Sequence, residues 1–317
     1  MPTPPPFLNL NERIEYLYRQ EYFEKASISD DDAARIDQLN FHYFLGYARN
    51  YRMLVGRGLV GASTKKISDV FAIIDQDHTV SEILYRGIRQ AEWALRQAVV
   101  KHYCACFDSA GSFLDEAQYL ETEAGSSARR VSSVLDQTLR YGEPYVSQHV
   151  DETAKALGLH RFKRYDPSGH ADCVKLVRDL PLWSIVDAFS LGTLSHFITE
   201  CDSRQDDSPK IWKSVAQEFS ISAAVFQSQI EALVVLRNIV FHQSRLWMRP
   251  TTQTPKTPKI FKKQLRGVDP KAMHVGFLNL ALFQPDGQQR PFAEAIEAAI
   301  SENPDYRYGV TKVQHHI

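Results

Sequence analysis

The sequence predicts an all-α protein. Apolar residues recur at positions i, i+3, i+4 and i+7 over long segments, which is the period of one helix face. Few runs alternate apolar and polar residues as a half-buried strand does. With 317 residues, of which 44% are hydrophobic and 24% charged, the chain has the composition of a globular protein with one large or two ordinary domains.

Capping residues and helix breakers locate the helices of the first half. Asn9 or Asn11 is a suitable N-cap for a first helix, and the cluster from Ser29 to Asp32 is suitable for a second. Glycines at 56, 58 and 61 then interrupt the periodicity. The helices expected here span about 11–24, 30–52, 80–107, 130–140 and 147–158, followed by a loop over 160–173.

The helical pattern continues in the second half. Pro181 suits the first turn of a helical segment that begins near Leu180, with Gly192 in its middle or between two short helices. Prolines at 250, 255 and 258 exclude a helix over the stretch that follows Arg249, which is expected to be an exposed arm or loop. The remaining elements are an acidic loop over 202–209 and helices at about 209–219, 222–248, 270–283 and 291–302.

The sequence argues against several classes of protein. No apolar run reaches the roughly twenty residues that cross a bilayer, so no membrane contact is expected. Residues 1–12 lack the basic and apolar regions of a secretory signal, which predicts a cytoplasmic location. The cysteines offer only one Cys-x-Cys spacing, which is typical of neither a disulfide framework nor a zinc site. We expect reduced cysteines, no metal and no cofactor.

Positive charge is concentrated in one segment. The net charge of the whole chain is −1. Between Ala232 and Val268, however, there is no Asp or Glu, and there are eight basic residues: Arg237, Arg245, Arg249, Lys256, Lys259, Lys262, Lys263 and Arg266. Such a run is either a path for RNA phosphates or a solvated loop with several lysines.

The helix expected over 222–248 carries a narrow polar stripe. At 100° per residue, one side of it holds an acid, an amide, an imidazole and two guanidinium groups: Glu231, Asn238, His242, Arg245 and Arg249. Arg237 falls within the apolar arc, where an arginine is expected only if its stem covers apolar surface and its head reaches an edge or a partner.

An arginine and a histidine at this spacing are suited to phosphodiester chemistry. Imidazole titrates near neutral pH and can move a proton to or from a ribose hydroxyl. Guanidinium can hold a phosphate by two parallel hydrogen bonds. The spacing alone is weak, because four pairs have four to six residues between the Arg and the His: Arg35/His42, Arg96/His102, Arg164/His170 and Arg237/His242. Only the last has an Asn directly after the Arg and an acid-free basic segment after the His.

The segment LRNIVFHQSRLWMR closely resembles the Leu-Arg-Asn-x-x-x-His-x-x-Arg-Leu-Trp signature of the Abi-like (abortive infection) family within the HEPN superfamily. Four further segments resemble other parts of that family in the same order, from about residue 6 to 250: PFLNLNERIEYLYRQEYF, LNFHYFLGYARNYR, IRQAEWALRQAVVKHY and LPLWSIVDAFSLGTLSHF. The resemblance implies a HEPN-type helical bundle over 79–250, with an N-terminal helical region over 1–78 and a Pro- and Lys-rich arm with C-terminal helices over 251–317.

The resemblance also implies a function. HEPN proteins of this kind are metal-independent endoribonucleases whose active site forms where two units pair, each contributing the Arg and the His. Arg237 and His242 would then be catalytic, Asn238 would position His242, and the single convincing motif implies a homodimer. A role in phage defence or as a toxin follows, with RNA as substrate and a regulatory RNA or an antitoxin protein as possible inhibitor.

Several residues keep two interpretations. Arg245 and Arg249 either bind RNA phosphates or stabilise the C-terminal end of the helix. Glu92 and Arg96 are either a supporting pair at the site or a plain i,i+4 ion pair. The whole protein has an alternative too: a non-catalytic scaffold that binds a structured RNA through the basic stretch from 237 to 266.

Overall fold

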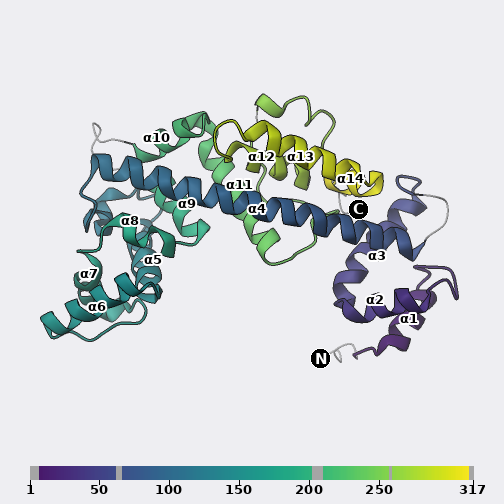
Figure 1. Ribbon diagram of the computed structural model, residues 1–317, viewed down its shortest axis with the longest axis horizontal. Helices are drawn as coiled ribbons and strands as arrows, with labels where there is room; N and C mark the ends of the chain where they lie inside the picture. The colour runs from purple at the N-terminus through teal and green to yellow at the C-terminus, as the bar shows by residue number, and fades with distance from the viewer. Residues whose placement is uncertain (1–6, 62–65, 202–209, 257–258, 314–317) are drawn as a thin grey trace. The chain divides into compact units, whose positions relative to one another are not determined.

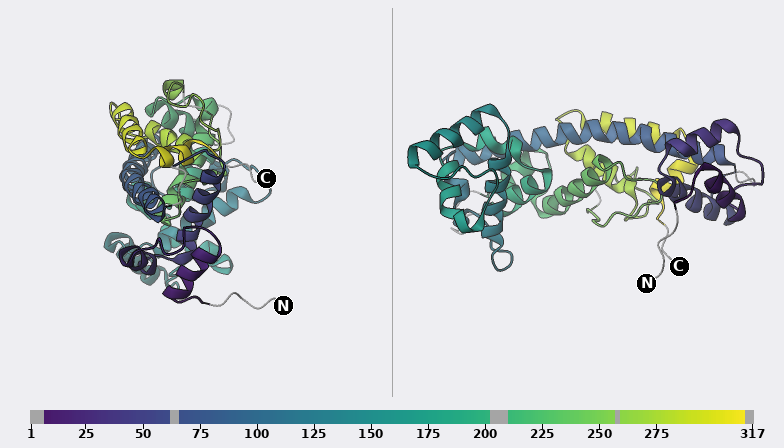
Figure 2. Two further views of the ribbon diagram at one scale, coloured as in Figure 1. Left: turned by 90° about the vertical axis from the view of Figure 1, so that its right-hand side faces the viewer. Right: turned by 90° about the horizontal axis from the view of Figure 1, so that it is seen from below.

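The computed structural model describes residues 7–61, 66–201, 210–256 and 259–313. Over these residues the fold is all-α, as predicted: helices are joined by loops, and β-structure is limited to isolated bridges (Figures 1 and 2). The helices of the first half are α1 (Leu10–Arg19), α2 (Asp30–Gln38), α3 (Phe41–Gly56), α4 (Ile67–Cys106), α5 (Ser126–Arg140) and α6 (Pro144–Leu157). Those of the second half are α7 (His170–Val177), α8 (Leu182–Ile185), α9 (Leu191–Glu200), α10 (Ile211–Glu218), α11 (Ala223–Phe241), α12 (Met273–Leu282), α13 (Gln289–Ser301) and α14 (Pro304–Thr311).

The chain forms two compact units that interleave along the sequence. Unit 1 contains residues 1–86, 236–278 and 290–317, and unit 2 contains residues 87–235 and 279–289. Both α4 and α11 contribute residues to each unit. This division differs from the three consecutive parts expected from the sequence, because a long helix can place its two halves in different units.

The N-terminal helices begin where the sequence indicates. Asn9 caps α1, and its side chain accepts from the backbone N–H of Glu12 at 3.1 Å while Glu12 bonds back to Asn9. Ser29 caps α2 in the same reciprocal way with Asp32. The single helix expected over 30–52 was wrong, because Asn40 caps a new helix, α3, by accepting from the Tyr43 N–H at 3.2 Å.

Other boundaries differ from the sequence prediction as well, and α1 ends at Arg19 rather than near residue 24. Helix α4 begins at Ile67 rather than near residue 80, because its polar run from Asp75 to Thr79 is helical. Helix α7 occupies the end of the loop expected over 160–173, and α14 was not expected at all. Ser190 caps α9, so Gly192 lies in its first turn. The acidic loop over 202–209 lies outside the described residues.

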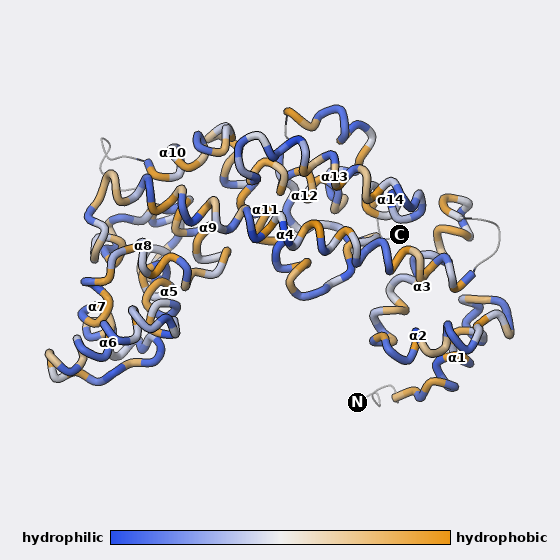
Figure 3. The backbone as a smooth tube through the Cα atoms, in the orientation of Figure 1, coloured by the Kyte–Doolittle hydropathy of each residue, from blue (hydrophilic) through white to orange (hydrophobic). Residues whose placement is uncertain are grey.

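Each unit has its own apolar core. In unit 1, aromatic side chains from α3, α4, the segment after α11 and α14 are fully buried: Phe44, Tyr47, Tyr51, Phe71, Trp247 and Tyr306. In unit 2, the largest buried side chains are Tyr103, Phe113, Tyr119, Phe189, Phe197 and Phe226. Amphipathic helices such as α6 show hydrophobic and hydrophilic segments in alternation (Figure 3).

Candidate active site

The residues of the Arg-Asn-His motif lie at the C-terminal end of α11, within unit 1. Arg237 is partly buried and its guanidinium carbon lies 4.4 Å from the centre of the Phe241 ring. Its Nη1 also donates to Oδ1 of Asn238 at 3.4 Å. This matches the expectation that the stem of Arg237 covers apolar surface while its head finds a partner. Asn238 and His242 are exposed, so all three polar groups are near solvent.

Helix α11 ends at Phe241, and the predicted helix over 222–248 was wrong beyond that point. The Ser244 N–H donates to the Ile239 carbonyl at 3.0 Å and the Gln243 N–H to the Val240 carbonyl at 3.0 Å. Gln243 has a φ of +51°. These two bonds around a left-handed residue are the Schellman arrangement that terminates helices. The polar stripe drawn on a continuous helix therefore holds only as far as the motif itself, and Arg245 and Arg249 leave it.

A buried carboxylate fixes the segment that follows the turn. Asp77 on α4 is only 1% exposed, and its oxygens accept from the Leu246 N–H at 3.0 Å, from the Tyr306 hydroxyl at 2.7 Å and from the Tyr47 hydroxyl. Burial raises the pKa of Asp77, and these hydrogen bonds oppose that rise in part. Asp77 thus joins three helices to the chain just after the motif.

Trp247 completes this anchor. Its indole N–H donates to the Asp305 carbonyl at 2.9 Å, and the Met248 N–H donates to the Gly309 carbonyl at 3.0 Å. A Cβ added at Gly309 would lie 2.0 Å from the indole nitrogen, so only glycine leaves room for this ring on α14. The tertiary contacts of Leu246 to Met248 thus require the chain to leave the axis of α11.

Arg245 is held inside unit 1. Its Nη1 donates to the Gly46 carbonyl, and its guanidinium carbon lies 5.6 Å from the centre of the Tyr47 ring. Burial lowers the pKa of the Arg245 guanidinium. These contacts give Arg245 a packing role, whereas its expected role in phosphate binding stays a prediction. Arg249 is partly exposed and its backbone N–H donates to Leu246.

The four lysines of the predicted RNA path, Lys256, Lys259, Lys262 and Lys263, are all exposed. They lie in unit 1, on the stretch that follows the motif, together with exposed Arg266. Residues 250–256 are not helical, as their prolines predict, and residues 257–258 lie outside the described part of the chain. The basic segment therefore presents its ammonium groups to solvent on the same unit as His242.

Glu92 and Arg96 belong to unit 2, not to the unit that holds the motif. They form the expected i,i+4 ion pair at 3.4 Å, and both side chains are largely buried. Arg96 also donates to the Phe189 carbonyl at 3.0 Å and lies 3.6 Å from Asp187. These contacts fix the segment before α9, while a supporting role at the site stays a prediction.

The other Arg-His pairs have partners of their own. His102 bonds to Glu218 at 2.7 Å, and Arg35 pairs with Asp75 at 2.7 Å. The Nδ1 atom of His170 and the Tyr165 hydroxyl form a hydrogen bond of 3.1 Å. In the described residues there is no group of three or more His, Cys, Asp or Glu side chains arranged to hold a metal ion.

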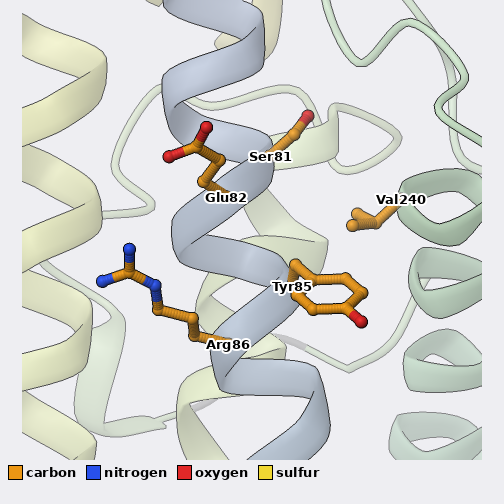
Figure 4. A pocket seen from close by; sticks show the side chains of 5 residues that line it. All are labelled: Ser81, Glu82, Tyr85, Arg86 and Val240. Carbon is orange, nitrogen blue, oxygen red and sulfur yellow. The ribbon is translucent and has the colours of Figure 1, made fainter.

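The structure has a cavity beside the motif that the sequence did not predict. It has a volume of about 260 Å³ and is lined by Ser81, Glu82, Tyr85, Arg86 and Val240 (Figure 4). Tyr85 is 42% exposed, and the centre of its ring lies 4.7 Å from that of Phe241. Tyr85 therefore lines the cavity and contacts Phe241, and Phe241 in turn contacts Arg237, all within unit 1.

Asp77 was also missed in the sequence, although its position offered a signal. It occupies a position of the apolar stripe of α4, whose buried members include Val70, Ile74, Val80 and Leu84. A carboxylate at such a position is rarely buried without a partner. That misplaced acid was the available signal in the sequence.

Helix α11 is long and apolar enough to cross a bilayer by length and composition alone. Nearly half of it, 44%, is buried inside the protein, and the core helices of soluble proteins pass the same test.

Comparison with known families agrees with the motif. The family model described as Abi-like protein matches residues 34–248, which is more than half of the chain and includes α11 with its motif. No curated protein and no solved structure matches the chain. Together with the all-α fold and the intact Arg-Asn-His motif, this match shows that the chain belongs to the Abi-like protein family.

Proposed function

We propose that this protein is a metal-independent endoribonuclease of the HEPN type, acting as a homodimer in the cytoplasm in abortive infection or as a toxin. The observation that carries the proposal is the presentation of Arg237, Asn238 and His242 together at the end of α11. The guanidinium is supported by Phe241 and Asn238, and the imidazole is exposed one turn further on.

The chemistry needs only groups that this chain supplies. One His242 takes the proton of a ribose 2′-hydroxyl, and the 2′-oxygen attacks the adjacent phosphorus. The bond from phosphorus to the 5′-oxygen breaks, and the partner subunit's His242 gives that oxygen a proton. The two Arg237 side chains bind the phosphoryl oxygens and stabilise their developing charge. The products are a 2′,3′-cyclic phosphate and a 5′-hydroxyl.

The deciding experiment is incubation of the purified protein with mixed cellular RNA in EDTA. We expect cleavage at the same rate with and without the chelator, because the proposed proton transfers use imidazole rather than a metal-bound water. Loss of cleavage in EDTA that Mg²⁺ restores would contradict the mechanism. Tight RNA binding without any cleavage would favour the non-catalytic scaffold instead.

A homodimer is the second expectation. Because one chain carries one motif and the proposed site needs two histidines, the active species should sediment with twice the 36.2 kDa mass of one chain. A two-fold interface uses the same surface on both copies, so the ends of both α11 helices should cross-link to each other. A monomer that cleaves RNA at full rate would refute the composite site.

The exposed lysines should bind RNA phosphates. Reversing Lys256, Lys259, Lys262 and Lys263 to Glu is expected to weaken RNA binding and to lower the slope of log affinity against log salt by up to about three, since each single-strand contact contributes about 0.7. The measurement is a titration at several salt concentrations. A control with the same charge change reverses four exposed lysines elsewhere: Lys25, Lys155, Lys163 and Lys213. Equal effects of the two variants would identify the basic segment as a solvated loop.

A further inference from the structure

The cavity lined by Tyr85 and Val240 has a size and lining that suit one planar ring. Its volume of about 260 Å³ is several times the roughly 30 Å³ that a water molecule occupies in the liquid. Drug-sized ligands usually need about 300–1,000 Å³, so the cavity admits a ring system rather than a whole nucleotide chain. Figure 4 shows Tyr85 and Ser81 on the side of α4 that faces Val240, with Glu82 and Arg86 leaving the helix on the other side.

We propose that this cavity receives one nucleobase of the RNA whose phosphate Arg237 holds, with Tyr85, which is 42% exposed, as the side chain on which the base stacks. The inference rests on the proposed function in that it takes RNA as the ligand. Aromatic side chains stack on unpaired bases whatever the sequence, because every base has a π face.

The positions of the aromatic rings support this assignment. Tyr85 packs on Phe241 with ring centres 4.7 Å apart and planes inclined by 32°, and Arg237 covers the same Phe241 ring. The phenyl ring of Phe241 thus contacts both the Arg237 guanidinium and the Tyr85 ring. A phosphate on Arg237 would place the neighbouring base within reach of the Tyr85 side of the cavity.

The lining of the cavity distinguishes a base from a phosphate as its occupant. Glu82 and Arg86 carry opposite charges and leave α4 on the side away from Val240 (Figure 4), so they offer a phosphate no net attraction in the cavity. Apolar surface from Tyr85 and Val240 then favours the uncharged part of the nucleotide, which is the base.

The test measures stacking directly on RNA that cannot be cut. A single-stranded oligonucleotide of 2′-O-methyl riboses lacks the attacking hydroxyl, and a 2-aminopurine moved through successive positions reports stacking as loss of fluorescence. We expect one position to be quenched by the full-length protein and by Tyr85→Phe, which keeps the ring. In Tyr85→Leu, which keeps apolar volume without a π face, quenching should vanish and affinity should fall about 5- to 150-fold.

Two controls separate this role from others. Tyr145→Leu removes another exposed aromatic side chain, from α6 in unit 2, and should leave both quenching and affinity unchanged. Sedimentation of Tyr85→Leu should match that of the unmodified protein. A smaller mass would show that a second copy covers the cavity and would overturn the proposal, as would quenching that persists in Tyr85→Leu or is absent from the unmodified protein.

Failure of the proposed function gives a different result. If the protein quenches the probe through Tyr85 but does not cleave natural RNA, the base site stands and the ribonuclease assignment falls. If natural RNA is cleaved while Tyr85→Leu quenches normally, the ribonuclease assignment stands and the base site falls.

Discussion

His242→Ala is expected to reduce RNA cleavage by about 10²- to 10⁴-fold, the usual contribution of one general acid or base. Because each proposed site uses the histidines of both subunits, the substitution removes the acid and the base together, so the upper part of that range is expected. His242 is exposed at a helix end, and its removal should leave the fold intact. The measurements are the single-turnover cleavage rate, growth toxicity and thermal unfolding of the same preparation.

His42→Ala is the matched control for this substitution. His42 is also exposed in unit 1 and also follows an arginine, Arg35, at a similar spacing, but it has no Asn beside that arginine. The His42→Ala variant should cleave RNA at the same rate as the unmodified protein. If His242→Ala cleaves RNA as fast as His42→Ala, the active site lies elsewhere in the chain.

Asp77→Ala is expected to lower the free energy of unfolding by several kcal/mol, because each buried donor left without an acceptor costs about 1–3 kcal/mol. The change leaves the Leu246 N–H and the hydroxyls of Tyr47 and Tyr306 without their acceptor. It also releases the segment after α11, so cleavage should fall at temperatures where the protein is still folded. Denaturant unfolding and cleavage rate measure the two effects.

Two further variants test whether the burial of Asp77 explains its effect on stability. Asp75→Ala removes a carboxylate two residues earlier on α4 that is 59% exposed and pairs with Arg35. This change should lower the free energy of unfolding by no more than about 1 kcal/mol.

The second variant, Asp77→Asn, tests the pH dependence of stability. Burial raises the pKa of Asp77, so at a pH between the ordinary pKa of 3.8 and the raised value the folded state holds a proton that the unfolded state has lost. Stability of the unmodified protein should therefore fall as pH rises from that value through the raised pKa, and this fall should be absent from Asp77→Asn. Equal pH profiles would contradict burial as the cause.

Much of the fold was determined by the sequence itself. Helical periodicity gave the all-α class, and local caps such as Asn9 and Ser29 located helix starts, because a cap depends on side chains only three residues apart. The Arg-Asn-His motif also survives intact, since Arg237 and Asn238 lie in the last turns of α11, where helical spacing still applies. The proline-rich stretch after Arg249 is non-helical over its described residues for an equally local reason.

The end of α11 was decided by tertiary structure. Between Phe241 and Pro250 the sequence has no glycine or proline to stop a helix, and its period continues to Arg249. The chain nevertheless turns at Gln243, because the carboxylate of Asp77 binds the Leu246 N–H and because Trp247 fills the space beside Gly309. Asp77 and Leu246 are 169 residues apart in the sequence, so no local pattern connects them.

The same distant contacts changed the candidate site. They moved Arg245 from a predicted polar stripe to a partly buried position against Gly46 and Tyr47. They also placed Tyr85 of α4 beside Phe241, a pairing of residues on two helices that no periodicity within one helix can reveal. The sequence by itself determined which groups carry the chemistry, because a motif is local. Tertiary structure decided which surroundings they have, because burial and hydrogen bonding between distant segments outweigh the propensity of a few residues to extend a helix.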